Sequence, residues 1–307
     1  MDQFSSHPLY RKHDLDSVMS SLWSFYVKHF LVLFLTSFVF NLAARFLYSS
    51  IDFAQLASIT DPFEMLSVVK KWIWPMAGMM VISFLMMVLL QYYIIYKPID
   101  STVNIFNSIY KMLKYLITYI LMMILFMIFA SIAMIAGFIV FFVGVFFSIL
   151  YIYMIYVFIL PILMTEGNNI GTAIGRTFIL SHRRFGPNLG WTAIILLIII
   201  VGTLVLSSLI LIPFAPKFFK ILTNPEEAMQ AMSFISNPWF IILSALASAL
   251  FAPVMLIYGA IIYFNARSRE NEELTPSAGT NEPDKVQVED LYAKPYAEDH
   301  PDNPEKK

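Results

Sequence analysis

One carboxylate and three guanidinium groups follow a long apolar run in the segment TEGNNIGTAIGRTFILSHRRF, residues 165–185. The planar fork of an arginine matches the geometry of a phosphate, so Arg176, Arg183 and Arg184 are candidate phosphate ligands. Glu166 would then orient one of them. The alternative, which we favour, is that Glu166 and Arg176 form an ion pair beside ordinary positive charge.

The rest of the sequence offers little for catalysis or metal binding. It contains no HExxH, GxSxG or GxxxxGKS motif, and it has no cysteine to act as a nucleophile or thiolate ligand. His13, Asp14 and Asp16 could ligate a cation, but Asp14 is better suited to cap a helix. The other histidines lack ligand spacing and are expected at the surface or the membrane boundary: His7, His29, His182 and His300. We therefore expect a non-enzymatic protein with no catalytic residue, no metal and no cofactor.

Composition indicates the elements that must carry these groups. Of the 307 residues, 59% are hydrophobic and only 13% are charged, whereas a soluble domain has about 25% charged residues. One soluble core cannot enclose this excess, because chains beyond roughly 250 to 300 residues split into domains instead of enlarging one core. The excess must face membrane lipids. A net charge of −1 gives no general attraction to nucleic acid.

Six apolar segments are long enough to cross a bilayer, which takes about 20 helical residues. Four segments each fit one crossing: 29–49, 72–96, 190–214 and 239–265. Residues 115–164 fit two crossings, with Gly137 and Gly144 as candidates for a tight turn. The sequence therefore predicts an all-α polytopic membrane protein of six transmembrane helices, arranged as three hairpins.

A short amphipathic helix is predicted before each odd-numbered crossing, from apolar residues at helical spacing in 15–26, 105–116 and 170–178. Both long loops of the first and third hairpins also carry a helix-start signal, TDPFE at 60–64 and TNPEE at 223–227, each expected to begin a short surface helix. The offset of 163 residues between these signals suggests an internal repeat.

Positive charge is unequally divided between the two sides of the membrane, and the side with more Lys and Arg is usually cytoplasmic. One side has eleven: Arg11, Lys12, Lys28, Lys97, Lys111, Lys114, Arg176, Arg183, Arg184, Arg267 and Arg269. The other has five: Arg45, Lys70, Lys71, Lys217 and Lys220. Both termini are therefore predicted to be cytoplasmic.

Three regions follow from these assignments. Residues 1–28 form a cytoplasmic N-terminal segment with an amphipathic entry helix, and residues 29–265 form the membrane domain. Residues 266–307 are acidic, rich in proline and poor in apolar residues, so we expect a disordered cytoplasmic tail. Leu291, Tyr292 and Tyr296 in this tail could anchor a protein partner, although an inert tail is the simpler interpretation.

Small and hydroxyl residues within the helices suggest packing contacts or a cavity. Gly171 and Gly175 are four residues apart and predict close contact with another helix. The stripe Ser244, Ser248 and Ala252 predicts close packing of the sixth crossing, in which Pro253 is expected to introduce a kink. Ser148, Tyr151, Tyr153 and Tyr156 could line a small cavity, but hydroxyls that bridge helices are the more common arrangement.

The segment PILMTEGNNIGTAIGRTFILSHRRFG resembles the hallmark of a family of poorly characterised bacterial six-helix membrane proteins, which includes the membrane domain of some glycerophosphoryl diester phosphodiesterases. The matching positions are Pro161, Glu166, Ala173, Arg176 and Gly186, with Thr177 in place of the family's serine. The resemblance implies a six-helix architecture in a bacterial membrane. It does not imply phosphodiesterase activity, because no soluble catalytic barrel is present in this sequence.

Two functions remain open at this point. The first is a non-enzymatic protein of the bacterial inner membrane that organises envelope components or contacts anionic lipid through its basic cytoplasmic side. The second is a carrier or flippase-like transporter of an apolar or lipidic substrate. Ion-coupled transport is not favoured, because no ionisable residue is expected near the centre of a crossing.

Overall fold

The computed structural model describes residues 4–51, 62–216, 219 and 235–274, and every regular element in these residues is helical. The α-helices are α1 (Leu15–Lys28), α2 (Phe30–Ser49), α4 (Pro62–Tyr96), α5 (Ile105–Ile139), α6 (Phe141–Thr165), α7 (Ile170–Arg183), α8 (Phe185–Leu211) and α11 (Pro238–Leu274), with a 3-10 turn, η1 (Ile212–Phe214), after α8. Six of them, α2, α4, α5, α6, α8 and α11, are long and apolar enough to cross a membrane. The protein is an all-α, multi-pass membrane protein, as its hydropathy predicts.

Two helices begin earlier than the sequence suggests. The amphipathic stretch at 105–116 is the first part of α5 and not a separate entry helix. Likewise, the helix that begins at Pro62 runs without a break into the second crossing, so it is not a separate surface helix. Both helices continue across these stretches, and α4 continues through Pro75 although a proline lacks the N–H for one backbone hydrogen bond. Residues 52–61 and 220–234 lie outside the described residues, and they include Thr60 and Asp61 of the first helix-start signal and all of the second.

The first and third amphipathic helices do form as separate elements. In α1, the Asp14 carboxylate accepts a hydrogen bond from the Ser17 N–H, and Ser17 Oγ accepts one from the Asp14 N–H, both at 2.9 Å. This reciprocal pair is a capping box, so Asp14 acts as the predicted cap. Asn169 caps α7 by accepting hydrogen bonds from the N–H groups of Gly171 and Thr172.

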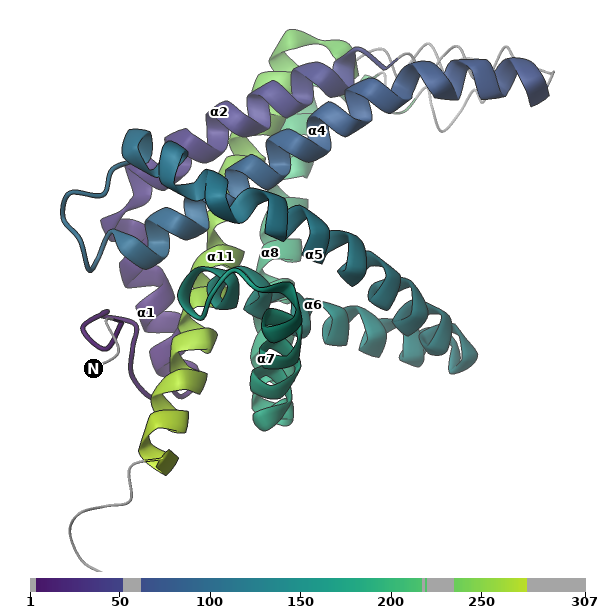
Figure 1. The fold of residues 1–307 in the computed structure, drawn as a ribbon. Helices are drawn as coiled ribbons and strands as arrows, with labels where there is room; N and C mark the ends of the chain where they lie inside the picture. The colour runs from purple at the N-terminus through teal and green to yellow at the C-terminus, as the bar shows by residue number, and fades with distance from the viewer. Residues whose placement is uncertain (1–3, 52–61, 217–218, 220–234, 275–307) are drawn as a thin grey trace, which may run out of the picture. The chain divides into compact units, whose positions relative to one another are not determined.

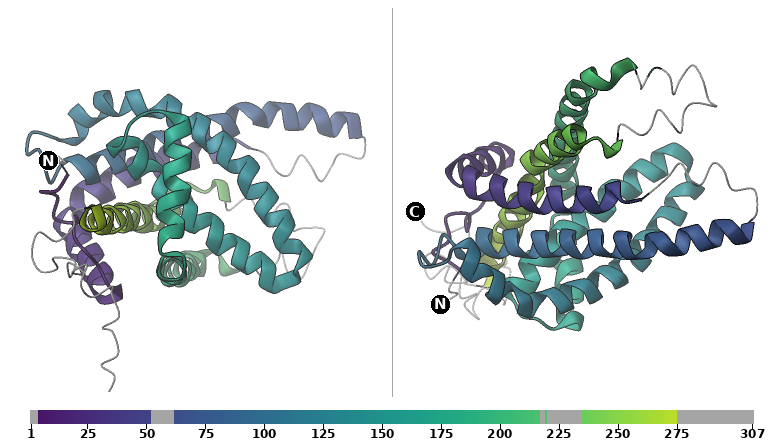
Figure 2. Two further views of the ribbon diagram at one scale, coloured as in Figure 1. Left: turned by 60° about the horizontal axis from the view of Figure 1, so that its bottom comes forward. Right: turned by 90° about the horizontal axis from the view of Figure 1, so that it is seen from above.

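Consecutive crossings pair as hairpins. Helices α2 and α4 run side by side, and so do α5 and α6 (Figure 1, Figure 2). The α5–α6 turn lies at Val140 and Phe141, and Phe141 has a φ of 56°. The expected turn glycines lie on either side of it. A Cβ added to Gly137 would lie 2.8 Å from the carbonyl oxygen of Gly144, so the two glycines allow close approach of the helices and do not form the turn.

The buried core lies towards one end of the helices. It is formed mainly by the last turns of α4 and α6 and by α11 from Leu256 to Phe264, together with residues of α1 and the N-terminal segment. These are the ends that the charge count predicts to be cytoplasmic. In contrast, the side chains around the α5–α6 turn are exposed, as expected for a surface that faces lipid.

The N-terminal segment and the start of the tail differ from expectation. His7 and His13 are buried, with 2% and 1% of their surface exposed, so His7 does not lie at the surface, the first of the two positions predicted for it. Helix α11 continues to Leu274, so the chain is helical beyond 265, and residues 275–307 lie outside the described residues. All contacts described below lie within residues 4–269, which belong to one compact unit.

Candidate functional site

Glu166 lies at the junction between α6 and α7. Helix α6 ends at Thr165, with Glu166 as its C-cap, and Gly167 follows with a φ of 122° that favours glycine. Asn169 then caps α7. The reversal brings Arg176, two turns into α7, back towards the carboxylate.

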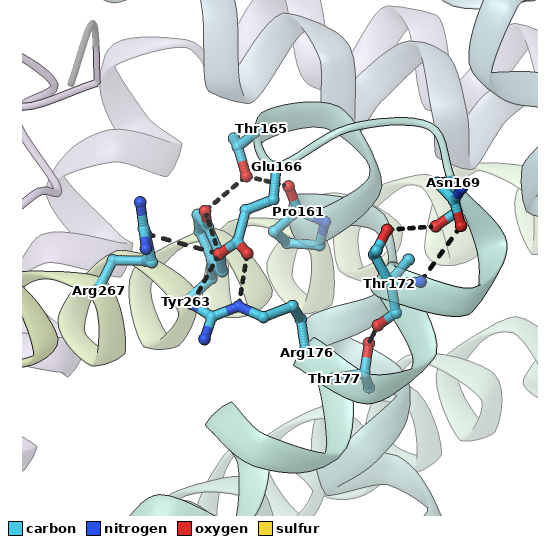
Figure 3. A network of polar contacts seen from close by, with 10 residues as sticks. Pro161, Thr165, Glu166, Asn169, Thr172, Arg176, Thr177, Tyr263 and Arg267 are labelled. Atoms are coloured by element: carbon cyan, nitrogen blue, oxygen red, sulfur yellow. Dashed lines mark hydrogen bonds and ion pairs between the residues drawn. The ribbon is translucent and has the colours of Figure 1, made fainter.

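A network of five side chains lies at this junction (Figure 3). Arg176 donates two hydrogen bonds to Glu166, from Nε to Oε2 at 2.6 Å and from a terminal nitrogen to Oε1 at 3.3 Å. Tyr263 of α11 donates to Glu166 Oε1 at 3.1 Å and accepts a hydrogen bond of 2.6 Å from the Thr165 hydroxyl. Arg267 Nε lies 3.5 Å from Glu166 Oε1, as an ion pair. The network therefore ties α11 to both α6 and α7.

The electrostatics of this network favour a structural role. The Glu166 side chain is only 16% exposed, while those of Arg176 and Arg267 are 24% and 23% exposed. Two guanidinium groups and one hydroxyl contact the Glu166 carboxylate, so its oxygens are occupied by partners from α7 and α11. The favoured interpretation of Glu166 and Arg176, an ion pair, agrees with this geometry.

The other two arginines of the segment do not lie in this network. Arg183 is in the last turn of α7 and is exposed, and Arg184 is the half-buried C-cap of that helix. Sequence reasoning missed Tyr263 and Arg267 as partners of Glu166. In the sequence, Arg267 was noted only as one of the positive charges of the cytoplasmic side, and Tyr263 was not noted at all.

The prediction that Gly171 and Gly175 pack closely against another helix is wrong. Both are exposed, and a Cβ added to Gly175 would meet no atom within 4 Å. The buried face of α7 is formed by Ala173, Thr177, Leu180 and Ser181. At 100° per residue, the two glycines lie on the opposite face of the helix. The spacing of four residues correctly predicts that the two glycines share one face of α7, but it does not reveal which face packs against other helices.

Comparisons with protein-family models, with characterised proteins and with solved structures found no significant match. The chemistry of this chain must therefore be argued from its own residues.

A second feature is a large cavity between the membrane-spanning helices. Its volume is about 620 Å³, and its walls come from α4, α5, α6, α8 and α11. The lining is mostly Met, Phe and aliphatic side chains, including Phe84, Met86, Met123, Phe126, Phe251 and Met255. The volume is within the range of about 300 to 1,000 Å³ that ligand sites occupy in proteins.

The expected cavity residues are only partly correct. Tyr153 and Tyr156 line the cavity, but Ser148 and Tyr151 are not part of its lining. The Ser148 hydroxyl donates to the Ala133 carbonyl at 2.9 Å, which bridges α6 to α5, and the Tyr151 hydroxyl lies 3.0 Å from His182 Nε2. These two hydroxyls therefore link elements, as the alternative interpretation proposed.

The small-residue stripe of α11 also has a different role from the predicted one. Ser244 is buried and donates to its own helix, whereas Ser248 and Ala252 line the cavity. Close packing occurs instead at Gly259, where an added Cβ would lie 2.6 Å from the Val157 carbonyl oxygen of α6. Helix α11 is continuous through Pro253, and a kink there stays a prediction.

Polar groups are few around the cavity. The Tyr156 hydroxyl donates to Met87 Sδ at 3.1 Å and lies 3.3 Å from the Tyr119 hydroxyl. Arg45 of α2 donates to the Ser248 hydroxyl at 3.3 Å. No cluster of three metal-binding side chains occurs in the part of the chain that the structure describes. The site therefore suits an apolar molecule with a small polar group more than a reaction that needs several ionisable residues.

Proposed function

We propose that this membrane protein binds the apolar chain of a lipid within the bilayer, without catalysing a reaction. The observation that carries the proposal is the cavity of about 620 Å³ with its apolar lining. Methionine and phenylalanine side chains suit a lipid chain, because they are apolar and methionine adapts to ligands of irregular shape. A lipid chain would thus find similar surroundings in the cavity and in the bilayer.

The accessibility of the cavity supports the same proposal. The cavity is partly open and not an enclosed void, so a chain of a bilayer lipid can reach its apolar walls. An apolar occupant, with chains of bilayer lipids as the nearest source, would restore the missing dispersion contacts.

The location that we propose is the bacterial inner membrane, with both termini in the cytoplasm. Eleven Lys and Arg residues on one side against five on the other support this orientation. The bacterial origin rests on the family resemblance of residues 161–186. Contact of the basic cytoplasmic side with anionic lipid, and a role in organising envelope components, are consistent with this orientation. Reporter fusions at both termini test this orientation. If a reporter that is active only outside the cytoplasm is active at either terminus, the proposed orientation is wrong.

A carrier of an apolar or lipidic substrate is the second candidate function. The observation in its favour is that all three hairpins contribute to the walls: α4 from the first, α5 and α6 from the second, and α8 and α11 from the third. A movement of one hairpin relative to another would therefore open or close the cavity. Transfer of a fluorescent lipid between leaflets of reconstituted vesicles tests this candidate.

Native mass spectrometry of the purified protein, with bilayer lipids retained, tests the proposed binding directly. Ala252→Trp places an indole in the cavity, and Leu204→Trp adds the same group on α8, where Leu204 is 62% exposed. We expect Ala252→Trp to reduce the retained lipid about tenfold and Leu204→Trp to leave it unchanged. Equal lipid retention in both variants and the wild type would refute the proposal.

Contact between the basic cytoplasmic segment and anionic lipid needs its own test. We expect replacement of Arg176, Arg183 and Arg184 together by glutamine to weaken binding to phosphatidylglycerol vesicles, because each basic residue near an anionic surface contributes about 1 kcal/mol. Since Arg176 also holds Glu166, the double replacement of Arg183 and Arg184 is the matched variant that leaves the network intact. Unchanged vesicle binding of both variants would remove this contact from the proposal.

A further inference from the structure

Three polar residues form a stripe along α2, a helix that is otherwise apolar enough to cross the membrane. Ser37, Asn41 and Arg45 follow one another at intervals of four, so they share one helix face. Ser37 is fully buried, and its hydroxyl has no hydrogen-bond partner. Polar side chains inside a membrane span are costly and therefore usually serve a function.

This stripe faces the walls of the cavity. Asn41 Nδ2 donates to Met86 Sδ at 3.4 Å, and Arg45 donates to Ser248 Oγ at 3.3 Å. Met86 and Ser248, from α4 and α11, both line the cavity. The guanidinium of Arg45 is thus one hydrogen bond away from the apolar cavity.

The charge of Arg45 lies within the span and lacks an anionic partner. Arg45 is four residues before Ser49, the last residue of α2, which is about 6 Å along the helix axis. Its hydrogen bond goes to the uncharged hydroxyl of Ser248, and in the described part of the chain it forms no ion pair with a carboxylate. A half-buried arginine in the last turns of a membrane-spanning helix is stabilised by an anion.

We propose that Arg45, together with Asn41 and Ser248, binds the anionic headgroup of a lipid whose chain fills the cavity. The inference rests on the proposed lipid binding and specifies the class of lipid. The guanidinium fork would donate two hydrogen bonds to phosphate or carboxylate oxygens, and the Ser248 hydroxyl is a further donor nearby. One N–H of Asn41 donates to the Ser37 carbonyl oxygen at 2.8 Å, and the other would exchange its weak contact with Met86 Sδ for a headgroup oxygen. The apolar chain and the negative headgroup would thus be held by adjacent parts of one site.

A lipid is a better match than a free anion, because the guanidinium lies beside an apolar cavity and within the predicted span. A soluble phosphate would have to lose its water without gaining any apolar contact. A lipid headgroup is already at the membrane boundary, and its chain gains contact with the cavity walls. The two sources can be separated by experiment.

The test compares phosphatidylglycerol with phosphatidylcholine of identical chains, by native mass spectrometry of the purified full-length protein. We expect the wild type to prefer phosphatidylglycerol about tenfold, the preference that one charge-assisted contact commonly provides. Arg45→Gln should lower phosphatidylglycerol retention to the level of phosphatidylcholine. Arg45→Lys, which keeps the charge, should retain part of the preference, and excess glycerol 3-phosphate should not displace the bound lipid.

Each result decides between the two proposals. If Arg45→Gln keeps the full preference for phosphatidylglycerol, the headgroup assignment is wrong. If Ala252→Trp retains both lipids as the wild type does, lipid binding in the cavity is itself wrong, whatever the headgroup. Displacement of the lipid by glycerol 3-phosphate would identify a soluble anion as the ligand instead. Should Arg45→Gln fail to fold, Ser248→Ala is the replacement variant, with a smaller but measurable loss of the preference expected and an unchanged preference counting against the assignment.

Discussion

Acidification is expected to release the N-terminal segment from the helices on which it packs, because His7 is buried in its neutral form. His7 Nε2 lies 3.2 Å from the Ile94 carbonyl oxygen, and Nδ1 accepts a hydrogen bond of 3.1 Å from the Leu9 N–H. The neutral ring therefore carries its proton on Nε2. It also stacks on Phe264, with ring centroids 4.5 Å apart. A second proton on Nδ1 would point at the Leu9 N–H and disrupt this arrangement.

The size of the effect follows from the pKa of His7. Burial lowers this pKa from 6.5 to about 4, while the hydrogen bond to Ile94 opposes the shift. Between these two values the released segment binds a proton and the docked segment does not, so docking weakens as the pH falls through this window. At pH 5 the loss is about 2 kcal/mol, which raises the fraction of released segment roughly thirtyfold. Above pH 6.5 His7 is neutral in both the docked and the released segment, so its full contribution to docking is present.

Neighbouring titratable groups either weaken docking in the same way as His7 or titrate outside the pH range between 4 and 6.5. Burial also lowers the pKa of His13, so its protonation opposes docking in the same way. The pKa of Asp14 is lowered from 3.8 by hydrogen bonds with Ser17, so the stability from that carboxylate is lost only at lower pH. The two histidines therefore account for the expected change between pH 7 and pH 5.

Hydrogen exchange of residues 4–14 at pH 7 and pH 5, corrected for the intrinsic rate of exchange, measures this release. His7→Gln is the control, because a glutamine can still donate to the Ile94 carbonyl but does not titrate in this range. We expect the wild type to lose roughly thirtyfold more protection than the variant, which should lose only the part due to His13. Equal pH dependence in both proteins would show that burial of His7 is not the cause.

Three substitutions test the packing of the membrane domain by thermal unfolding in detergent. Glu166→Gln should lower stability by about 2 to 4 kcal/mol, because it leaves Arg176 half-buried without its carboxylate, and an unchanged midpoint would show that the pair contributes nothing. Gly259→Ala should lower stability by roughly 1 to 3 kcal/mol, because the new Cβ would meet the backbone of Val157 at 2.6 Å. Gly175→Ala should raise stability by about 0.5 to 1 kcal/mol, because the position is open and helical, and a loss would reveal a packing contact there.

The crossings could be predicted from the sequence because hydropathy reports them directly. All six occur, and the capping roles of Asp14 and Asn169 were also predictable, since a cap depends on residues within three positions. Helix ends were less accurate. The starts of α4 and α5 depend on whether a helix continues past the membrane boundary, and neither Lys70 nor Lys71 interrupts a helix.

In the Glu166 network, contacts between residues close in the sequence could be predicted, and contacts between distant residues could not. Arg176 is ten residues from Glu166 across one turn, so their pairing could be proposed from the sequence. Tyr263 is 97 residues away, and its contact depends on the pairing of α6 with α11. The same dependence explains why Gly259 was missed. A glycine is required there by the backbone of Val157, which no spacing within α11 reveals.

The apolar walls of the cavity could not be predicted, because a side chain that faces an apolar cavity has the same character as one that faces the bilayer. Phe126 lines the cavity and Ile128 is exposed outside it, yet both are apolar residues of α5. Polar residues provide the discriminating signal, since their cost is not tolerated on a surface that faces only lipid. The stripe from Ser37 to Arg45 carried that signal, but Arg45 was counted as charge of an external loop. Its position within α2 and its hydrogen bond to Ser248 show that the Arg45 side chain points towards the cavity wall. The residue therefore belongs to the proposed lipid site and not to an external loop.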